Sequence, residues 1–310
     1  MPAPFVRPRG FSLYNAPYVL LTCVALLWAI NLVVGRYVAG HVPPATLAMV
    51  RWMGATLILL PFAWKQISRD WPVIRRSLPM LTLLAATGIA SYNAMSYYGL
   101  QYTQAVNGLL VQSTAPLLVA VWSFVLFRER LGLGQMAGVV TSMAGVLLII
   151  SHGDLDTFLH LKPNVGDVWI IVALVIYAFY ATILRNRPPL GPLSFLSSIM
   201  ALGSLLLIPF ALWEASQGKY LPLDHVTFAT LAYVMTGPSL VAYLFFNRGV
   251  ELVGANAAAP FLHLLPVFGT ALAIIFLGEE MAWYHFAGYA LVITGIALAT
   301  LSARARRKAA

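Results

Sequence analysis

Charged residues are scarce in this chain, and their scarcity excludes most classes of soluble protein. Of its 310 residues, 9% are charged and 60% are hydrophobic, and the mean hydropathy is +0.82. Soluble domains are about a quarter charged, so these few charges could not cover the surface of a water-soluble fold. The apolar runs are continuous and do not alternate about ten residues at a time, which excludes a transmembrane β-barrel. The sequence therefore predicts an all-α polytopic membrane protein.

The chain also lacks the usual signatures of enzymes and metal sites. Its single cysteine, Cys23, lies in the first apolar run and can form no intrachain disulfide. The motifs G-x-x-x-x-G-K-[ST], H-E-x-x-H and G-x-S-x-G do not occur. We therefore expect no ATP use, no metal, no cofactor and no catalytic residues. The alternative, a membrane enzyme acting on a lipid-linked substrate, would need a paired nucleophile and base at membrane depth.

Acidic residues within the apolar runs are a further absence. No aspartate or glutamate lies clearly inside a predicted span. Carriers coupled to protons or sodium commonly need an embedded carboxylate. The sequence therefore favours facilitated flow down a gradient, or proton coupling through His263 at most.

Ten apolar segments are present, each near the roughly 20 residues that a transmembrane helix needs. They cover residues 17–38, 44–64, 78–98, 102–127, 133–151, 166–184, 190–213, 225–247, 251–277 and 282–303. With the N-terminus in the cytoplasm, fifteen of the 19 Lys and Arg residues lie at cytoplasmic ends. Because Lys and Arg favour that side, residues 1–16 and 304–310 are predicted to be cytoplasmic tails. The net charge of +9 then reflects topology, and we expect no nucleic-acid partner.

The chain resembles itself at a fixed offset. At 150 residues, the aligned pairs include Pro116 with Pro266, Glu129 with Glu279, Gly138 with Gly288, and Gly145 with Gly295. At 148 residues, Pro44 aligns with Pro192 and Leu60-Pro61-Phe62 with Ile208-Pro209-Phe210. Each copy holds five segments, so the second copy is inverted in the membrane. Two inverted five-helix repeats, 17–151 and 166–303, are a common plan of secondary transporters. An old duplication without a transport role is the alternative.

Several of these residues resemble the EamA domain. The resemblance lies in Trp28 and Asn31 of the first segment, Pro44 and Arg51 of the second, and the run Ala105, Pro116, Glu129, Gly138 and Gly145, which Ala255, Pro266, Glu279, Gly288 and Gly295 repeat. It covers nearly the whole chain and implies the drug/metabolite transporter superfamily, with ten spans and both termini inside. Among its members the chain is most similar to the YddG-type aromatic amino-acid exporters. The second unit departs from the pattern, because isoleucines replace the Trp and Arg.

Polar and aromatic residues inside the spans are the candidates for substrate binding, because such groups usually face the bundle interior. We predict a site from Trp28, Asn31, Tyr92, Ser96, Gln112, Tyr177, Tyr180, Tyr243, Asn247 and His263. Aromatic faces mixed with neutral hydrogen-bonding groups suit an amphipathic organic solute. The alternatives are interfacial anchors for the tyrosines and helix-to-helix bonds for the amides. Arg51 is expected to tie helices to loop carbonyls, or to attract a substrate carboxylate.

Helix breakers at matching places in the two halves predict moving regions around the site. These gating candidates are Gly88, Pro116, Gly237, Pro238 and Pro266. Passive kinks are the alternative reading.

Taken together, the sequence predicts a secondary transporter in the bacterial inner membrane. We expect it to export small metabolites by alternating access, with aromatic or hydrophobic amino acids and amphipathic drugs as its substrates. Its partners are then the solute and the lipid bilayer, with a monomer as the sufficient unit. A different solute class, such as nucleotide sugars or amines, is the alternative.

Overall fold

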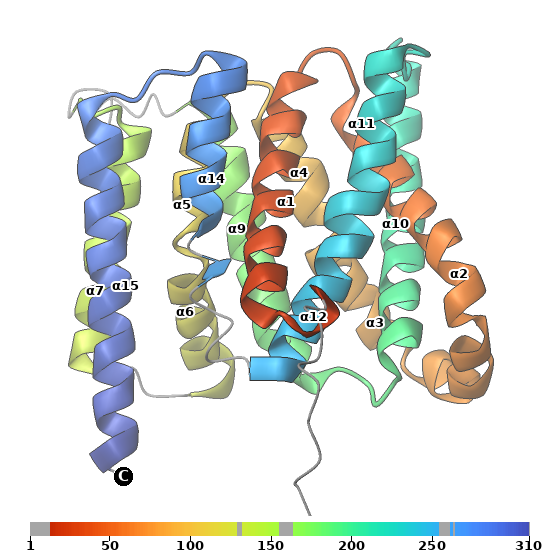
Figure 1. The fold of residues 1–310 in the computed structure, drawn as a ribbon, viewed down its shortest axis with the longest axis horizontal. Helices are drawn as coiled ribbons and strands as arrows, with labels where there is room; N and C mark the ends of the chain where they lie inside the picture. The colour runs from red at the N-terminus through yellow and green to blue at the C-terminus, as the bar shows by residue number, and fades with distance from the viewer. Residues whose placement is uncertain (1–12, 129–131, 155–163, 254–260, 263, 310) are drawn as a thin grey trace, which may run out of the picture.

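The computed structural model describes residues 13–128, 132–154, 164–253, 261–262 and 264–309, and within these ranges it contains helices and no strands. The first half holds α1 (Pro17–Tyr37), α2 (Pro44–Arg76), α3 (Leu78–Ala85), α4 (Tyr92–Gly99), α5 (Ala105–Gln112), α6 (Ala115–Phe127) and α7 (Leu133–Ile150). The second half holds α9 (Val165–Ile183), α10 (Pro192–Ser216), α11 (His225–Thr236), α12 (Ala242–Val253), α14 (Leu264–Leu272) and α15 (Trp283–Ala309). The helices stand side by side, with α7 and α15 at one edge and α2 at the other (Figure 1).

Six described helices are long and apolar enough to cross a bilayer. The consecutive helices α5 and α6, bent by 46° relative to each other, can supply a seventh crossing. Shorter apolar helices cover Met136–Ile149, Leu264–Leu277 and Trp283–Leu298. The helix α1 begins, and α15 ends, at the lower end of the bundle in Figure 1. An all-helical membrane protein is therefore confirmed for the described residues.

Two helices differ from the sequence prediction. The predicted span 44–64 continues as one helix to Arg76, because a polar amphipathic stretch extends it and Pro61 and Pro72 are accommodated inside. The predicted span 102–127 breaks at Ser113 and Thr114, just before Pro116 in the first turn of α6. A proline there lacks the N–H that would continue the α5 hydrogen bonding, which explains why the break falls at this point.

Two short π-helical segments interrupt helices at matching positions. One, η2 (Ala86–Ser91), joins α3 to α4, and the other, η4 (Gly237–Val241), joins α11 to α12. At the 150-residue offset the two segments overlap, with Gly88 opposite Pro238. The Ser239 hydroxyl donates to Val234 O at 2.7 Å, so a side chain satisfies a backbone carbonyl in the irregular turn. Such π segments often occur at functional sites.

Contacts between the halves are reciprocal. The Cβ that an alanine at Gly145 would add lies 2.5 Å from Gly288 O, and that at Gly295 lies 2.4 Å from Gly138 O. At the 150-residue offset, Gly145 corresponds to Gly295 and Gly138 to Gly288, so the two contacts are equivalent in the repeat. The helices α7 and α15 therefore meet through two matched pairs of glycines, where the absence of side chains lets the backbones approach.

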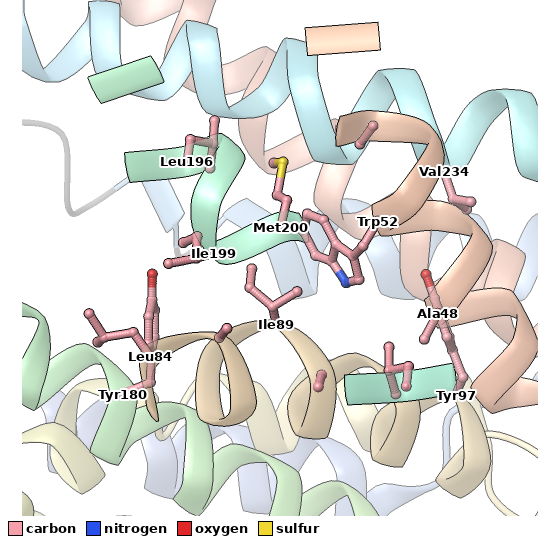
Figure 2. Packing of buried hydrophobic residues seen from close by; sticks show 14 of the residues in the cluster. Ala48, Trp52, Leu84, Ile89, Tyr97, Tyr180, Leu196, Ile199, Met200 and Val234 are labelled. Carbon is pink, nitrogen blue, oxygen red and sulfur yellow. The ribbon is translucent and has the colours of Figure 1, made fainter. Parts of the chain in front are cut away.

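The main core lies between α2, α3, η2 and α10. Figure 2 shows Ile89 close to Trp52 and Met200, all of which are at most 1% exposed. A Cβ added at Gly203 would lie 2.3 Å from Ile89 Cγ2, so this glycine lets α10 sit directly on η2. The core thereby fixes one wall of the central region described below.

Replacing Gly145 with alanine should weaken the α7–α15 pair. The added methyl group would strike a backbone oxygen, which yields less easily than a side chain. Overpacking of this kind costs about 1–3 kcal/mol. Thermal unfolding in detergent measures the loss, and Val140→Ala on the exposed side of the same helix is the control. Equal unfolding temperatures for the two variants would contradict the close approach.

Candidate functional site: a central aromatic and polar cavity

A cavity of about 180 Å³ lies in the middle of the bundle. Segments of both halves line it, including α1, α2, η2, α4, α5, α6, α9, α12 and α14. Its wall is formed by Trp28, Asn31, Leu32, Arg51, Trp52, Gly88, Tyr92, Asn93, Gln112, Ser113, Ala115, Pro116, Leu174, Tyr177, Tyr243, Leu262, Leu265 and Pro266. Both the η2 segment and the α5–α6 break contribute to it, so the two irregular stretches of the first half meet at one place.

Aromatic rings form two parts of the wall. The Tyr92 and Tyr177 rings lie 4.6 Å apart between centroids, and Gln112 Nε2 donates to Tyr92 OH at 2.5 Å. Trp28 meets Tyr243 edge to face, with 5.8 Å between centroids. The Trp28 indole N–H also donates to Pro238 O at 3.1 Å, which connects the wall to the η4 segment. The rings supply apolar faces, and the polar tips of Tyr92 and Trp28 are bonded to neighbours.

Arg51 places a positive charge in the wall. Its side chain is 3% exposed, and Nε donates to Ser239 Oγ at 2.7 Å. The second nitrogen, Nη1, lies 2.9 Å from Asn31 Oδ1, 2.9 Å from Asn93 Oδ1 and 2.6 Å from Tyr97 OH. Arg51 thereby ties α2 to α1, α4 and η4. In the part of the chain that the structure describes, Arg51 donates through Nε and Nη1, so Nη2 is the group able to meet a solute.

Every acceptor around Arg51 is neutral. Among the described residues, no carboxylate lies within 4.0 Å of its guanidinium. A buried cation without a counter-ion is costly, and an anionic group entering the cavity would relieve that cost. The wall therefore combines apolar faces, amide groups and one uncompensated positive charge.

The predicted site residues divide into those that line the cavity and those that do not. The lining includes Trp28, Asn31, Tyr92, Gln112, Tyr177 and Tyr243, together with the helix breakers Gly88, Pro116 and Pro266. Ser96 and Tyr180 are buried behind the wall, with Tyr180 stacked near Tyr177 at 5.6 Å. Asn247 is exposed in the middle of α12 and does not line the cavity. His263 lies outside the described residues. The binding and gating roles stay predictions.

Several residues of the cavity wall, and one residue beside it, were not among the predicted site residues. Trp52 and Asn93 line the cavity, although neither was among the predicted site residues. Tyr97, which does not line the cavity, is 3% exposed and bonds both Arg51 and Asn31. The available signal was the position of Asn93 and Tyr97, which are spaced four apart and therefore share one helix face.

Three acidic residues near the ends of the predicted spans are buried. Glu214 is 5% exposed, and its two oxygens accept from Ala45 N at 2.9 Å and Thr46 N at 2.8 Å. Glu279 is 8% exposed and accepts from Ala105 N and Val106 N at 2.8 and 2.9 Å. Each carboxylate thus caps the free N–H groups at the start of a helix from the other half. Asp167 is 1% exposed and lies in the first turn of α9, so it too is buried in the protein close to a helix end. The prediction that no carboxylate lies inside a span stays a prediction.

Comparisons with known proteins agree with this fold. The profile of the EamA-like transporter family matches residues 15–151 and 164–301. The uncharacterized transporter YyaM of Bacillus subtilis is 26% identical, with 91% of this chain and 93% of that protein covered. A probable amino-acid metabolite efflux pump of Salmonella typhimurium is 26% identical, with 94% and 96% covered. The uncharacterized inner membrane transporter YicL of the same species is 23% identical, with 92% and 95% covered.

A solved crystal structure shares the fold. It matches with a TM-score of 0.63 at 20% identity, and the match covers 94% of this chain and 98% of that one. The relatives named above are described as transporters or an efflux pump, which favours transport over catalysis.

Proposed function

Because this chain belongs to the EamA-like transporter family of the drug/metabolite transporter superfamily, we propose that it is a secondary transporter exporting small metabolites. The observation that carries the proposal is the central cavity, where aromatic faces and amides surround the Arg51 guanidinium. Solute sites are typically apolar pockets with a few fixed polar groups. The position between the two halves is where such transporters bind their substrates.

Aromatic or hydrophobic amino acids are the proposed substrates. Their carboxylate would meet Arg51, and their side chain would meet the Tyr92 and Tyr177 rings. The cavity volume of about 180 Å³ is below the roughly 300–1,000 Å³ of sites for drug-sized ligands, which favours small solutes. The relative named as a probable amino-acid metabolite efflux pump supports the same class. Specificity of the YddG type, and passage of small amphipathic drugs, belong to this proposal.

The proposed mechanism is alternating access by two inverted five-helix repeats, residues 17–151 and 166–303. The matched π segments and the reciprocal glycine contacts support this arrangement. Ten spans would then place both termini in the cytoplasm, as the Lys and Arg distribution predicts. Location in the bacterial inner membrane is supported by the relative named as an inner membrane transporter. The Gly88, Pro116, Pro238 and Pro266 positions would move with the repeats.

Counterflow in liposomes tests the proposed function. Purified protein should exchange labelled phenylalanine or tryptophan for the same unlabelled amino acid inside, and a charge-matched dipeptide panel should compete poorly. Protein-free liposomes and liposomes carrying Glu251→Ala, altered at an exposed residue far from the cavity wall, are the controls. Absence of counterflow for every amino acid, with flux of nucleotide sugars or amines, would replace the proposed substrate class.

A further inference from the structure

A chain of buried polar side chains lies apart from the central cavity. Thr103 Oγ1 and Asn107 Nδ2 both donate to Asp167 Oδ1, the amide at 3.3 Å. Asn107 Nδ2 also lies 3.1 Å from Thr103 Oγ1, and His285 Nε2 lies 3.0 Å from Asn107 Oδ1. These four residues join the starts of α5, α9 and α15, of which α15 begins at the upper end of Figure 1. None of the four lines the central cavity.

The tautomer of His285 decides the directions of these hydrogen bonds. The Ala282 amide donates to His285 Nδ1 at 2.9 Å, so Nδ1 is the acceptor and Nε2 carries the ring proton. Nε2 then donates to Asn107 Oδ1, and the Asn107 amide group donates onward to Asp167 Oδ1. The series of hydrogen bonds therefore ends at one oxygen of Asp167, Oδ1.

The other oxygen of Asp167 is left without a partner. Oδ2 is buried and makes no hydrogen bond, in a residue that is 1% exposed. Glu214 and Glu279 differ, because both oxygens of each accept backbone N–H groups. Within the described part of the chain, Asp167 also has no Lys or Arg within 4.0 Å. Burial with no partner for Oδ2 disfavours the charged carboxylate relative to the neutral acid, whereas the two bonds to Oδ1 favour the charged form.

Among the described residues, the titratable groups around Asp167 place no fixed positive charge in contact with it. The helices α5 and α6 and the segment η2 carry none, and the titratable side chains of α4 are tyrosines. His152 and Tyr284, with rings 5.4 Å apart, are the other nearby groups, along with His285. Arg36 lies 3.9 Å from Glu279 and donates to Leu100 O at 2.8 Å, in the loop between α4 and α5. Glu279 accepts from Ala105 N at the start of α5, and neither charged residue bonds to Asp167.

We propose that Asp167 is a proton-binding site whose occupancy follows closure of α9 against the start of α5. In the closed arrangement seen here, water is excluded and a proton from solution binds Oδ2. When α9 parts from residues 99–104, water would reach the carboxylate and the proton would leave. Close packing in the structure supports closure, since a Cβ at Gly166 would lie 2.4 Å from Gly99 O.

The same helix reaches the substrate cavity. Leu174 and Tyr177 of α9 line the cavity, and Tyr177 stands ten residues from Asp167, about 15 Å along the axis. Movement of α9 would therefore change both sites together. Coupling of proton binding to export rests on the proposed transport function, whereas proton binding itself does not.

Unfolding of the purified protein at different pH values tests proton binding without any transport. If the folded protein holds a proton that the unfolded chain releases, the wild-type unfolding temperature falls as pH rises. Asp167→Asn, which keeps the shape and cannot ionise, should lose that part of the dependence. Glu280→Gln, at an exposed acid, should behave as wild type. An unchanged pH dependence in Asp167→Asn would overturn the proposal.

A second variant keeps the test decisive if Asp167→Asn folds poorly. Thr103→Val removes a donor to Oδ1 and should extend the pH dependence to higher pH, because the ionised form loses support. A shift in the opposite direction, or none, would also overturn the proposal.

Transport assays then test the coupling. In liposomes with a pH gradient, wild type should accumulate solute, while Asp167→Asn should retain counterflow and lose the gradient-driven accumulation. Equal accumulation by both proteins would overturn the coupling. Absence of counterflow in every protein, with the pH dependence of unfolding intact, would instead overturn the proposed transport function and leave the proton site standing.

Discussion

Arg51→Gln should reduce transport of amino acids roughly 10- to 150-fold. A hydrogen bond to a charged group contributes about 1.5–3 kcal/mol, which corresponds to this range of rate or affinity. Glutamine keeps a donor for Asn31 and Asn93 but removes the positive charge from the cavity wall. Counterflow of labelled phenylalanine measures the effect, and circular dichroism with size-exclusion chromatography establishes that the variant folds.

A change of substrate distinguishes two roles of Arg51: binding the substrate carboxylate, or only joining helices. Wild type should prefer phenylalanine to phenylalaninamide, which lacks the negative charge, and Arg51→Gln should lose this preference. Arg51→Lys, which keeps the charge but not the planar fork, should retain part of it. If Arg51→Gln lowers transport of both compounds equally, Arg51 acts only by joining α2 to its neighbours. The comparison is informative because the substrate change and the mutation remove opposite ends of the same contact.

The presence of most helices could be predicted from the sequence, because a helix that crosses a bilayer needs about 20 apolar residues. The rule fails where a helix continues beyond the apolar region, as α2 does through its basic stretch to Arg76. It also fails where a span is two helices, as at Ser113 and Thr114. In both places the local backbone is decided by neighbours in space, which a hydropathy pattern does not contain.

The candidate site was partly predictable for a related reason. Helical spacing places Tyr92 and its neighbours on one face, and interior polar groups in membranes are few. Spacing could not show that Arg51 of α2 meets Asn31 of α1 and Asn93 of α4, because that depends on how three helices pack. The burial of the acidic residues could not be predicted for the same reason. Their position near span ends suggested exposure, whereas helix N-termini of the other half cover them.

Two of these end contacts form a reciprocal pair. Glu214 accepts from Thr46 N at 2.8 Å, and Gln66 Oε1 accepts from Ser194 N at 2.9 Å. At the 148-residue offset, Thr46 corresponds to Ser194 and Gln66 to Glu214. The same role is therefore performed in one half by an amide and in the other by a carboxylate. The carboxylate caps two N–H groups and also accepts from the Thr46 hydroxyl at 2.8 Å, so it should contribute more.

Glu214→Ala should lower the free energy of unfolding by about 3 kcal/mol, and Gln66→Ala by about 1 kcal/mol. The first variant strands buried N–H groups that a charged acceptor now satisfies, and the second removes one neutral hydrogen bond. Chemical unfolding in detergent micelles measures both values. Glu214→Gln should fall between them, since one amide oxygen can replace part of the cap.

The control for this comparison is Glu251→Ala. Glu251 pairs with Arg248 at 2.9 Å on the surface, where its side chain is 68% exposed. Exposed pairs of this kind contribute about 0–1 kcal/mol, so its removal should change stability little. Similar losses in Glu214→Ala and Glu251→Ala would mean that the Glu214 cap adds nothing to the joint between the halves. A larger loss in Gln66→Ala than in Glu214→Ala would reverse the assigned order and show that the amide cap is the stronger of the reciprocal pair.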